Sequence, residues 1–155
     1  MVKAVVFAVP GDIATPTGGY AYDRRIIAEL GVLGWQAEVL GLGEGFPFPS
    51  ADTRATAGAR LAALPGPHPI VVDGLAFGAL PEAADALRGS HRLIALVHHP
   101  LALETGLSAT DRAALHRSER SALTCARHVI ATSTTSARLL AADYGVPPDL
   151  SLIHI

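Results

Sequence analysis

Short apolar runs alternate with longer stretches of helical periodicity along this chain. Residues 3–9 are apolar after Lys3, which is typical of a strand buried on both faces, and Pro10-Gly11 ends it. Later runs with the same character predict further strands at 36–42, 70–72, 92–97, 128–132 and the start of a sixth at 151–155.

The segments between these runs predict helices. Ile26, Ile27, Leu30 and Leu33 recur at three- and four-residue spacing in a helix that begins near Tyr20. An alanine-rich helix is expected at 51–64, a short helix with proline in its first turn at 81–88, and another helix at 134–144. Ser108 can cap a long helix that runs to about 126, with Asp111 at its third position.

Strand–helix alternation from end to end predicts an α/β protein with a Rossmann-like, three-layer, doubly wound parallel sheet. In such sheets ligands bind beyond the carboxyl ends of the strands, where the strand order reverses. Three loops are expected to meet there: the loop after the first strand, residues 98–100 and residues 133–134.

Composition narrows the class of protein. The 155 residues carry a formal net charge of −2, so no global basic field points to nucleic acid as a partner. Cys125 is the single cysteine, which excludes an intrachain disulfide and a multi-cysteine metal cage. No apolar run approaches the length of about 20 residues that spans a bilayer, nor does the first strand resemble a signal peptide. We expect one globular domain in the cytoplasm.

The first loop could approach a ligand closely. Gly18 and Gly19 follow a strand and open a helix, where free backbone N–H groups attract phosphate or sugar oxygens. The loop has neither the spacing of the dinucleotide fingerprint nor the lysine of a P-loop. A tight turn is the alternative interpretation.

Two histidines end the predicted fourth strand. His98 or His99 could bind a substrate hydroxyl, act as an acid or base, or ligate a metal. The alternative is one ring that caps backbone groups and one that is exposed. Glu104 could meet a polar ligand or be solvated, and Asp73 could bind a ligand or cap a turn, with the turn favoured. We find no convincing metal-ligand set beyond these residues and expect no metal site.

One face of the predicted long helix is basic. Arg112, His116 and Arg120 are four residues apart and therefore share that face. We expect either a solvated face or a peripheral contact with acidic lipids at the inner face of the membrane.

Taken in order, these features resemble a known family. The glycine pair opens the first helix, Leu-Val-His-His-Pro ends a strand at 96–100, Glu119-Arg120 lies in the long helix, and Val-Ile-Ala-Thr-Ser follows at 129–133. This arrangement is similar to the N-terminal half of a family 4 glycosyltransferase, a retaining enzyme of the two-domain GT-B fold. The resemblance covers nearly the whole chain.

The resemblance implies that residues 1–149 are the acceptor-binding domain of an enzyme that moves a sugar from a nucleoside diphosphate to an acceptor hydroxyl. By the same resemblance, Gly18 and Gly19 line the cleft near the acceptor and the donor phosphates, and His98 faces the reacting sugar. His99 occupies a position where the family often has aspartate, and Ser133 matches a polar position on the acceptor side. Glu104 is a further candidate for substrate binding. No metal or other cofactor is implied.

One departure from the family is large. The C-terminal domain that would bind most of the nucleotide-sugar is absent from these 155 residues, so we expect the chain alone to be inactive. Residues 150–155 are also the in-frame translation of CTGTCTCTTATACACATC, which resembles a transposon-end adaptor of sequencing libraries. We therefore expect a non-native tail at 150–155, with a native sixth strand as the alternative. A stand-alone binding subunit that partners a separate donor-domain chain is the alternative function, and a nucleotide-binding regulatory domain is a third.

Overall fold

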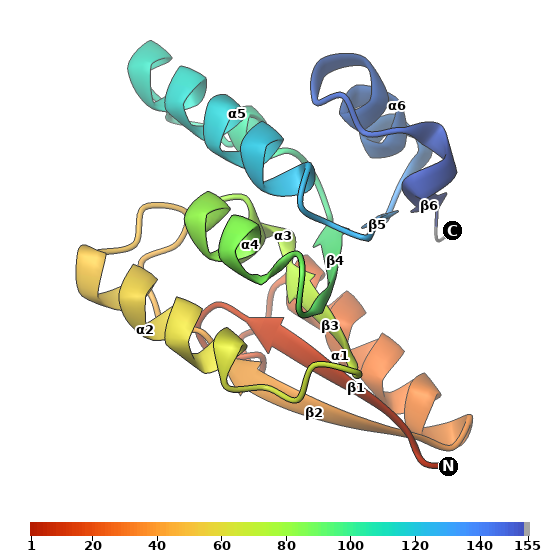
Figure 1. Ribbon diagram of the computed structural model, residues 1–155. Helices are drawn as coiled ribbons and strands as arrows, with labels where there is room; N and C mark the ends of the chain where they lie inside the picture. Colours follow the sequence, from red (N-terminus) through yellow and green to blue (C-terminus); the bar gives the residue numbers. More distant parts are fainter. Residues whose placement is uncertain (154–155) are drawn as a thin grey trace.

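Six parallel strands form one sheet in the computed structural model, which describes residues 1–153 (Figure 1). The strand order is β2-β1-β3-β4-β5-β6. Their bounds are Lys3–Val9 (β1), Trp35–Gly41 (β2), Pro69–Asp73 (β3), Arg92–Val97 (β4), His128–Ala131 (β5) and Ser151–Ile153 (β6). The doubly wound α/β fold predicted from the alternation is confirmed.

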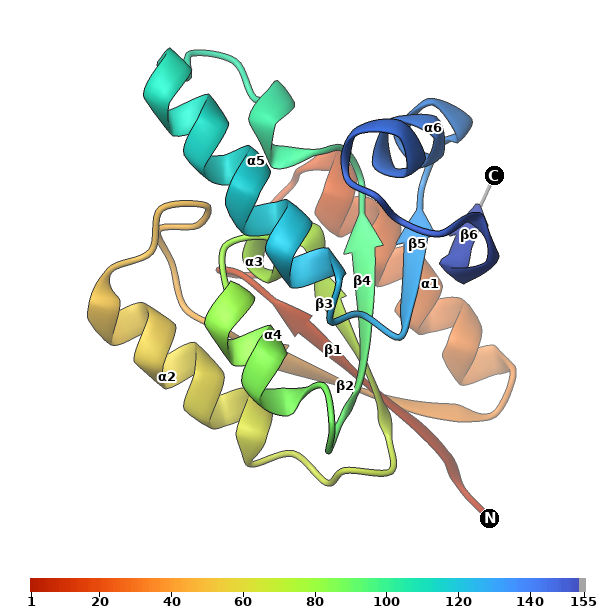
Figure 2. The same cartoon turned by 45° about the horizontal axis from the view of Figure 1, so that its top comes forward.

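The strand order places the helices in two layers. The chain moves from β1 outward to β2 and then returns past β1 to β3, so the first crossover and the later ones cover opposite faces. Helix α1 (Gly18–Val32) packs on one face, against Val5, Phe7, Val71 and Leu96. The other face carries the helices α2 (Ala51–Ala62), α4 (Pro81–Leu87), α5 (Ala109–Leu123) and α6 (Thr134–Asp143) (Figures 1 and 2).

Helix starts follow the capping chemistry of the sequence. The Ser108 hydroxyl accepts a hydrogen bond from the Asp111 N–H at 3.0 Å, as predicted for the start of α5. Pro81 occupies the first turn of α4, also as predicted. Helix α1 begins at Gly18, two residues before the predicted start, because the Thr17 side chain supplies the cap.

Three short elements were not predicted. Helix α3 (Gly74–Phe77) follows β3 directly, and the 3-10 turns η1 (Leu101–Leu103) and η2 (Pro148–Leu150) follow prolines. Each is too short to show helical periodicity in the sequence. The strand β6 forms as expected over 151–153 and pairs with β5, whereas residues 154 and 155 of the expected tail lie outside the described residues.

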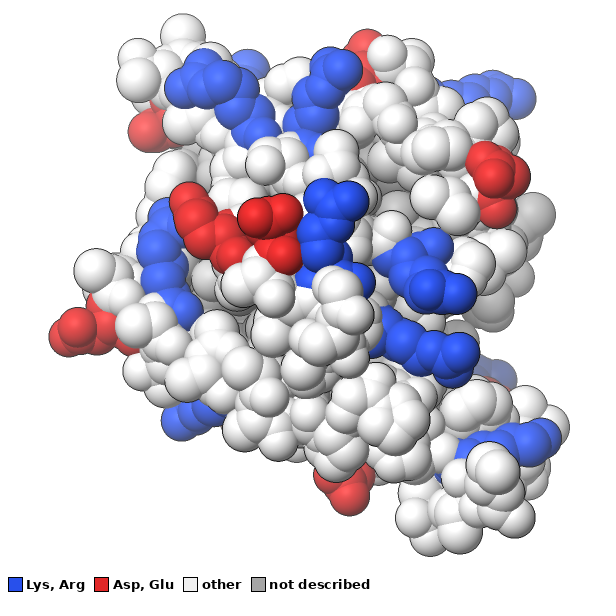
Figure 3. Space-filling view, viewed as in Figure 1, with Lys and Arg blue, Asp and Glu red and all other residues white. Residues whose placement is uncertain are grey.

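Basic side chains of α5 serve internal contacts. Arg112 donates to the Ala102 carbonyl at 2.5 Å, and Arg120 donates to the Asp143 carbonyl at 3.3 Å. A ring nitrogen of His116 lies 3.1 Å from the same Asp143 carbonyl. This face therefore ties α5 to η1 and α6, while Arg112 and Arg120 remain exposed, as expected for a solvated face. On the face in Figure 3, Lys and Arg are interspersed with Asp and Glu over largely uncharged surface.

Two glycines should respond in opposite ways to alanine substitution. A Cβ at Gly74 would lie 2.9 Å from the Leu96 carbonyl oxygen and 3.2 Å from the Val97 Cα, both part of the β4 backbone. We expect Gly74→Ala to lower the free energy of unfolding by about 1–3 kcal/mol because a strand cannot move aside cheaply. A Cβ at Gly31 would meet nothing within 4 Å, so Gly31→Ala should raise the free energy of unfolding by about 0.5–1 kcal/mol.

Urea denaturation of both variants and of the wild type measures these changes. A Gly74→Ala protein as stable as the wild type would contradict the close packing of α3 against β4.

Candidate functional site

The polar residues of the candidate site lie at the carboxyl ends of three neighbouring strands. The loop after β1 leads into α1, Asp73 ends β3, and His98 follows β4. Strand order reverses between β1 and β3, which is where ligands bind in sheets of this class. The predicted meeting of the first loop with residues 98–100 is therefore confirmed.

Gly19 lets α1 approach the His98 ring. A Cβ at Gly19 would lie 3.2 Å from His98 Cδ2 and 3.3 Å from Nε2, so a side chain there would push against the imidazole. Gly18 is not under this constraint, because a Cβ at Gly18 would meet nothing within 4 Å. The Tyr22 ring meets the His98 ring edge-on, with centroids 5.5 Å apart. Helix α1 thus forms one wall around the histidine.

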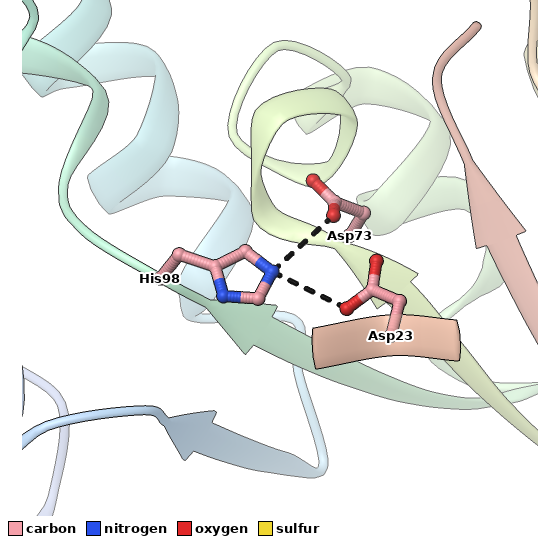
Figure 4. Close-up of side chains that lie close together, drawn as sticks. All are labelled: Asp23, Asp73 and His98. Carbon is pink, nitrogen blue, oxygen red and sulfur yellow. Dashed lines mark ion pairs between the residues drawn. The ribbon is translucent and has the colours of Figure 1, made fainter. Parts of the chain in front are cut away.

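Two carboxylates flank the inner nitrogen of His98. Its Nε2 lies 3.3 Å from Asp23 Oδ1 and 3.6 Å from Asp73 Oδ2 (Figure 4). Asp23 is fully buried and Asp73 is 5% exposed, while the His98 side chain is 21% exposed. Asp73 also caps α3, because its Oδ1 accepts from the Leu75 N–H at 2.9 Å. The favoured interpretation of Asp73 as a turn cap is therefore confirmed, and Asp73 also lines the cavity beside His98.

The environment of this cluster changes its proton affinities. Burial alone lowers the pKa of His98, but the contacts with Asp23 and Asp73 outweigh burial and raise it from 6.5 to about 9. Burial raises the pKa of Asp23 to about 6, although the neighbouring His98 opposes this effect. Near neutral pH the cluster therefore holds an imidazolium between two carboxylates.

His99 and Glu104 form a second, more exposed pair. His99 Nε2 lies 2.6 Å from Glu104 Oε1, and these side chains are 52% and 39% exposed. Leu101 lies between His99 and Glu104 in the sequence, and its N–H donates to the buried Glu119 Oε2 at 2.8 Å. Burial raises the pKa of Glu119 to about 7, while the hydrogen bond from Leu101 works in the opposite direction. Glu119 thus fastens the loop after His98 to α5.

A cavity of about 270 Å³ opens beside these groups. The residues that line it include Gly19, Tyr20, Asp73, His98, His99 and Glu104. A larger hollow of about 400 Å³ lies between η1, α5 and α6, with mostly apolar walls. We favour the smaller cavity as the functional site because it combines convergent polar groups with ionisable groups of shifted pKa.

The structure brings four of the six predicted site residues to this cavity. These are Gly19, His98, His99 and Glu104. Gly18 lies one residue away, at the start of α1. Ser133 lies at the end of β5, where its hydroxyl caps α6 by accepting from the Ser136 N–H at 3.1 Å, and it does not line the cavity.

Sequence reasoning missed Asp23. The signal was present, because Asp23 falls in the same helical stripe as Gly19, Tyr22, Ile26 and Ile27, which turns toward the sheet. A charged residue inside an apolar stripe is either paired or functional. Pairing with His98 could not be read from the sequence, since the two residues are 75 positions apart by their numbers.

A search of residues 1–153 for side chains that could hold a metal ion finds Asp23, Asp73 and His98. Their potential ligand atoms lie within 4.8 Å of one another. Ion pairing between an imidazolium and two carboxylates accounts for this closeness without a metal. We therefore treat the cluster as an ion-paired histidine.

Comparisons with protein-family models and with curated proteins found no relative of this chain. No family model matches the chain, and no curated protein matches it. Across the described part of the chain, no helix combines the length and the apolar character needed to cross a membrane.

The raised pKa of His98 predicts how stability depends on pH. Between pH 7 and pH 9 the folded chain holds a proton on His98 that the unfolded chain, with a pKa near 6.5, releases. The stabilisation is complete below pH 6.5 and is lost as pH rises through about 9. The free energy of unfolding should therefore fall by on the order of 2–3 kcal/mol over this range.

Urea denaturation at half-unit pH steps measures this slope, with His98→Gln as the control in which it should be much smaller. A wild-type stability that is flat or rises between pH 7 and pH 9 would show that His98 is not held as an imidazolium.

Proposed function

We propose that this domain is the acceptor-binding half of a retaining, family 4 GT-B glycosyltransferase. The reaction would transfer a sugar from a nucleoside diphosphate to an acceptor hydroxyl. The observation that carries the proposal is the close approach of Gly19 to the His98 ring beside the cavity at the switch in strand order. This contact joins the glycine pair and the strand-end histidine, the two motifs on which the family resemblance chiefly depends.

The roles of the residues follow from what each can offer. Backbone N–H groups at Gly18 and Gly19, at the start of a 15-residue helix, favour phosphate or sugar oxygens. His98 would donate a hydrogen bond to a group at the reacting centre, where a fixed positive donor stabilises developing negative charge. His99, paired with Glu104, is available to bind a substrate hydroxyl at the cavity rim.

The remaining assignments complete the proposal. Ser133 would contact the acceptor side, since capping α6 uses its oxygen as an acceptor and leaves its hydroxyl hydrogen to donate. The reaction would need no metal or cofactor beyond the nucleotide-sugar, and a second domain would supply most of the donor site. The enzyme would work in the cytoplasm, and it would make peripheral contact with the inner face of the membrane.

Turnover of a two-domain protein that contains residues 1–149 tests this function. In this protein, residues 1–149 are joined to a GT-B donor-binding domain, and it is assayed with nucleoside diphosphate sugars and acceptor glycosides. We expect His98→Ala to lower kcat by about 100-fold or more, because a contact made in the transition state is lost. His99→Ala should lower kcat less, because His99 is more exposed and lies at the rim.

His91→Ala is the matched control, since His91 lies near Leu64 and away from the cavity. The proposal fails if no sugar transfer occurs with any donor. Equal, near-wild-type rates for His98→Ala and His99→Ala would remove His98 from the reacting centre.

A further inference from the structure

We propose that Asp23 is a positioning residue: its buried carboxylate holds the His98 ring with Nε2 turned inward, as an imidazolium whose Nδ1–H faces the ligand cavity. This inference deepens the proposed function, since it concerns the histidine assigned to the reacting centre. It nevertheless rests on the geometry of α1, β3 and β4, and its test requires no sugar transfer.

Within residues 1–153, the charged neighbours of the buried Asp23 carboxylate are His98 and Asp73. It is fully buried on the face of α1 that packs on the sheet, beside Tyr22 and Ile26. Among the described residues neither of its oxygens has a hydrogen-bond donor, and its ion-pair contact is with His98. Asp73 differs, because one of its oxygens caps α3. An isolated buried carboxylate is strongly disfavoured, so the contact with His98 is what makes an ionised Asp23 tolerable at this position.

His98 is held at its backbone carbonyl and at one ring nitrogen. Its backbone carbonyl accepts hydrogen bonds from Ser136 Oγ at 3.0 Å and from Thr132 Oγ1 at 3.4 Å. Its Nε2 points toward the two carboxylates, while Nδ1 lies on the side of the ring away from them (Figure 4). No hydrogen bond to Nδ1 occurs within residues 1–153, and His98 lines the cavity. Nδ1 is therefore the ring nitrogen left for a ligand.

The other groups that face His98 favour its charged form. Helix α1 contributes Asp23 and the edge-on ring of Tyr22, and the end of β3 contributes Asp73. The start of α6 contributes the neutral hydroxyl of Ser136. Tyr20, also on α1, has its pKa raised to about 12 by burial and by nearby carboxylates, so it stays neutral at physiological pH. Two carboxylates therefore oppose a single cation, which keeps the proton on the histidine.

The arrangement has a chemical consequence at the opposite side of the ring. A carboxylate bound to one nitrogen of a histidine fixes the ring orientation and stabilises the imidazolium. His98 would then act as a hydrogen-bond donor from Nδ1 over the whole physiological pH range. It would suit a ligand atom that carries or develops negative charge, such as a phosphate or a leaving-group oxygen.

Nuclear magnetic resonance of the 155-residue chain tests the proposal. Long-range ¹H–¹⁵N spectra of the histidine rings, assigned with His98→Gln, report the protonation midpoint of His98 in the wild type and in Asp23→Asn. We expect the wild-type ring to be an imidazolium at pH 7.5. Asp23→Asn should weaken proton binding to His98 by about tenfold or more, since it removes the nearer carboxylate. Asp85→Asn is the matched control, because Asp85 is an exposed helical aspartate paired with Arg88.

Several results would overturn the inference. One is a neutral His98 ring in the wild type at pH 7.5, which can be observed even if Asp23→Asn does not fold. Another is an unchanged midpoint in a folded Asp23→Asn protein. A third is stoichiometric Zn²⁺ binding in isothermal titration that Asp23→Asn abolishes, which would make the cluster a metal site. If the titration behaves as expected while the two-domain protein transfers no sugar, the positioning role stands and only the proposed reaction falls.

Discussion

All strands of a parallel sheet end at the same edge, and the candidate site of this chain depends on that constraint. Crossovers return the chain to the opposite edge before each new strand, so segments far apart in sequence finish side by side. The loop before α1, the end of β3 and the end of β4 meet in this way. The strand-order reversal between β1 and β3 then leaves room for a cavity that the helices do not fill.

Electrostatics gives this edge its character. The core on both faces of the sheet is almost entirely apolar, and Asp23, Asp73, Glu119 and Ser136 are the buried polar residues within 1–153. Asp23, Asp73 and Ser136 contact His98 itself. Glu119 contacts Leu101, in the loop that follows His98. Buried polar groups cost stability unless they are paired, so their concentration around one loop indicates a site rather than a packing accident.

The sequence predicted the fold more completely than the site. Apolar runs predicted β1 and β4 with the bounds that the structure shows, because a strand buried on both faces leaves an unbroken apolar segment. Helix starts were predictable where a capping side chain was evident, as at Ser108, and were displaced where Thr17 took that role. Helix α3 was not predictable, since four residues carry no periodicity.

Site residues were predictable only one at a time. Strand ends and a glycine pair directed attention to Gly19 and His98, because these positions follow from local pattern and topology. The pairing of Asp23 with His98 could be seen only in the structure. Asp23 is a helix residue, and in the sequence only its place in an apolar stripe distinguishes it from a solvated aspartate. Ser133 shows the converse case, a strand-end residue that the structure uses to cap α6.

The location of a bound ligand tests the central claim most directly, namely that the cavity at Gly19 and His98 is the functional site. Crystals of the chain soaked with a nucleoside diphosphate sugar and with an acceptor glycoside would show where each binds. The account predicts a ligand oxygen within about 2.7–3.2 Å of His98 Nδ1, beside the start of α1. A ligand that occupies the hollow between η1, α5 and α6 instead, with the His98 cavity empty, would contradict it.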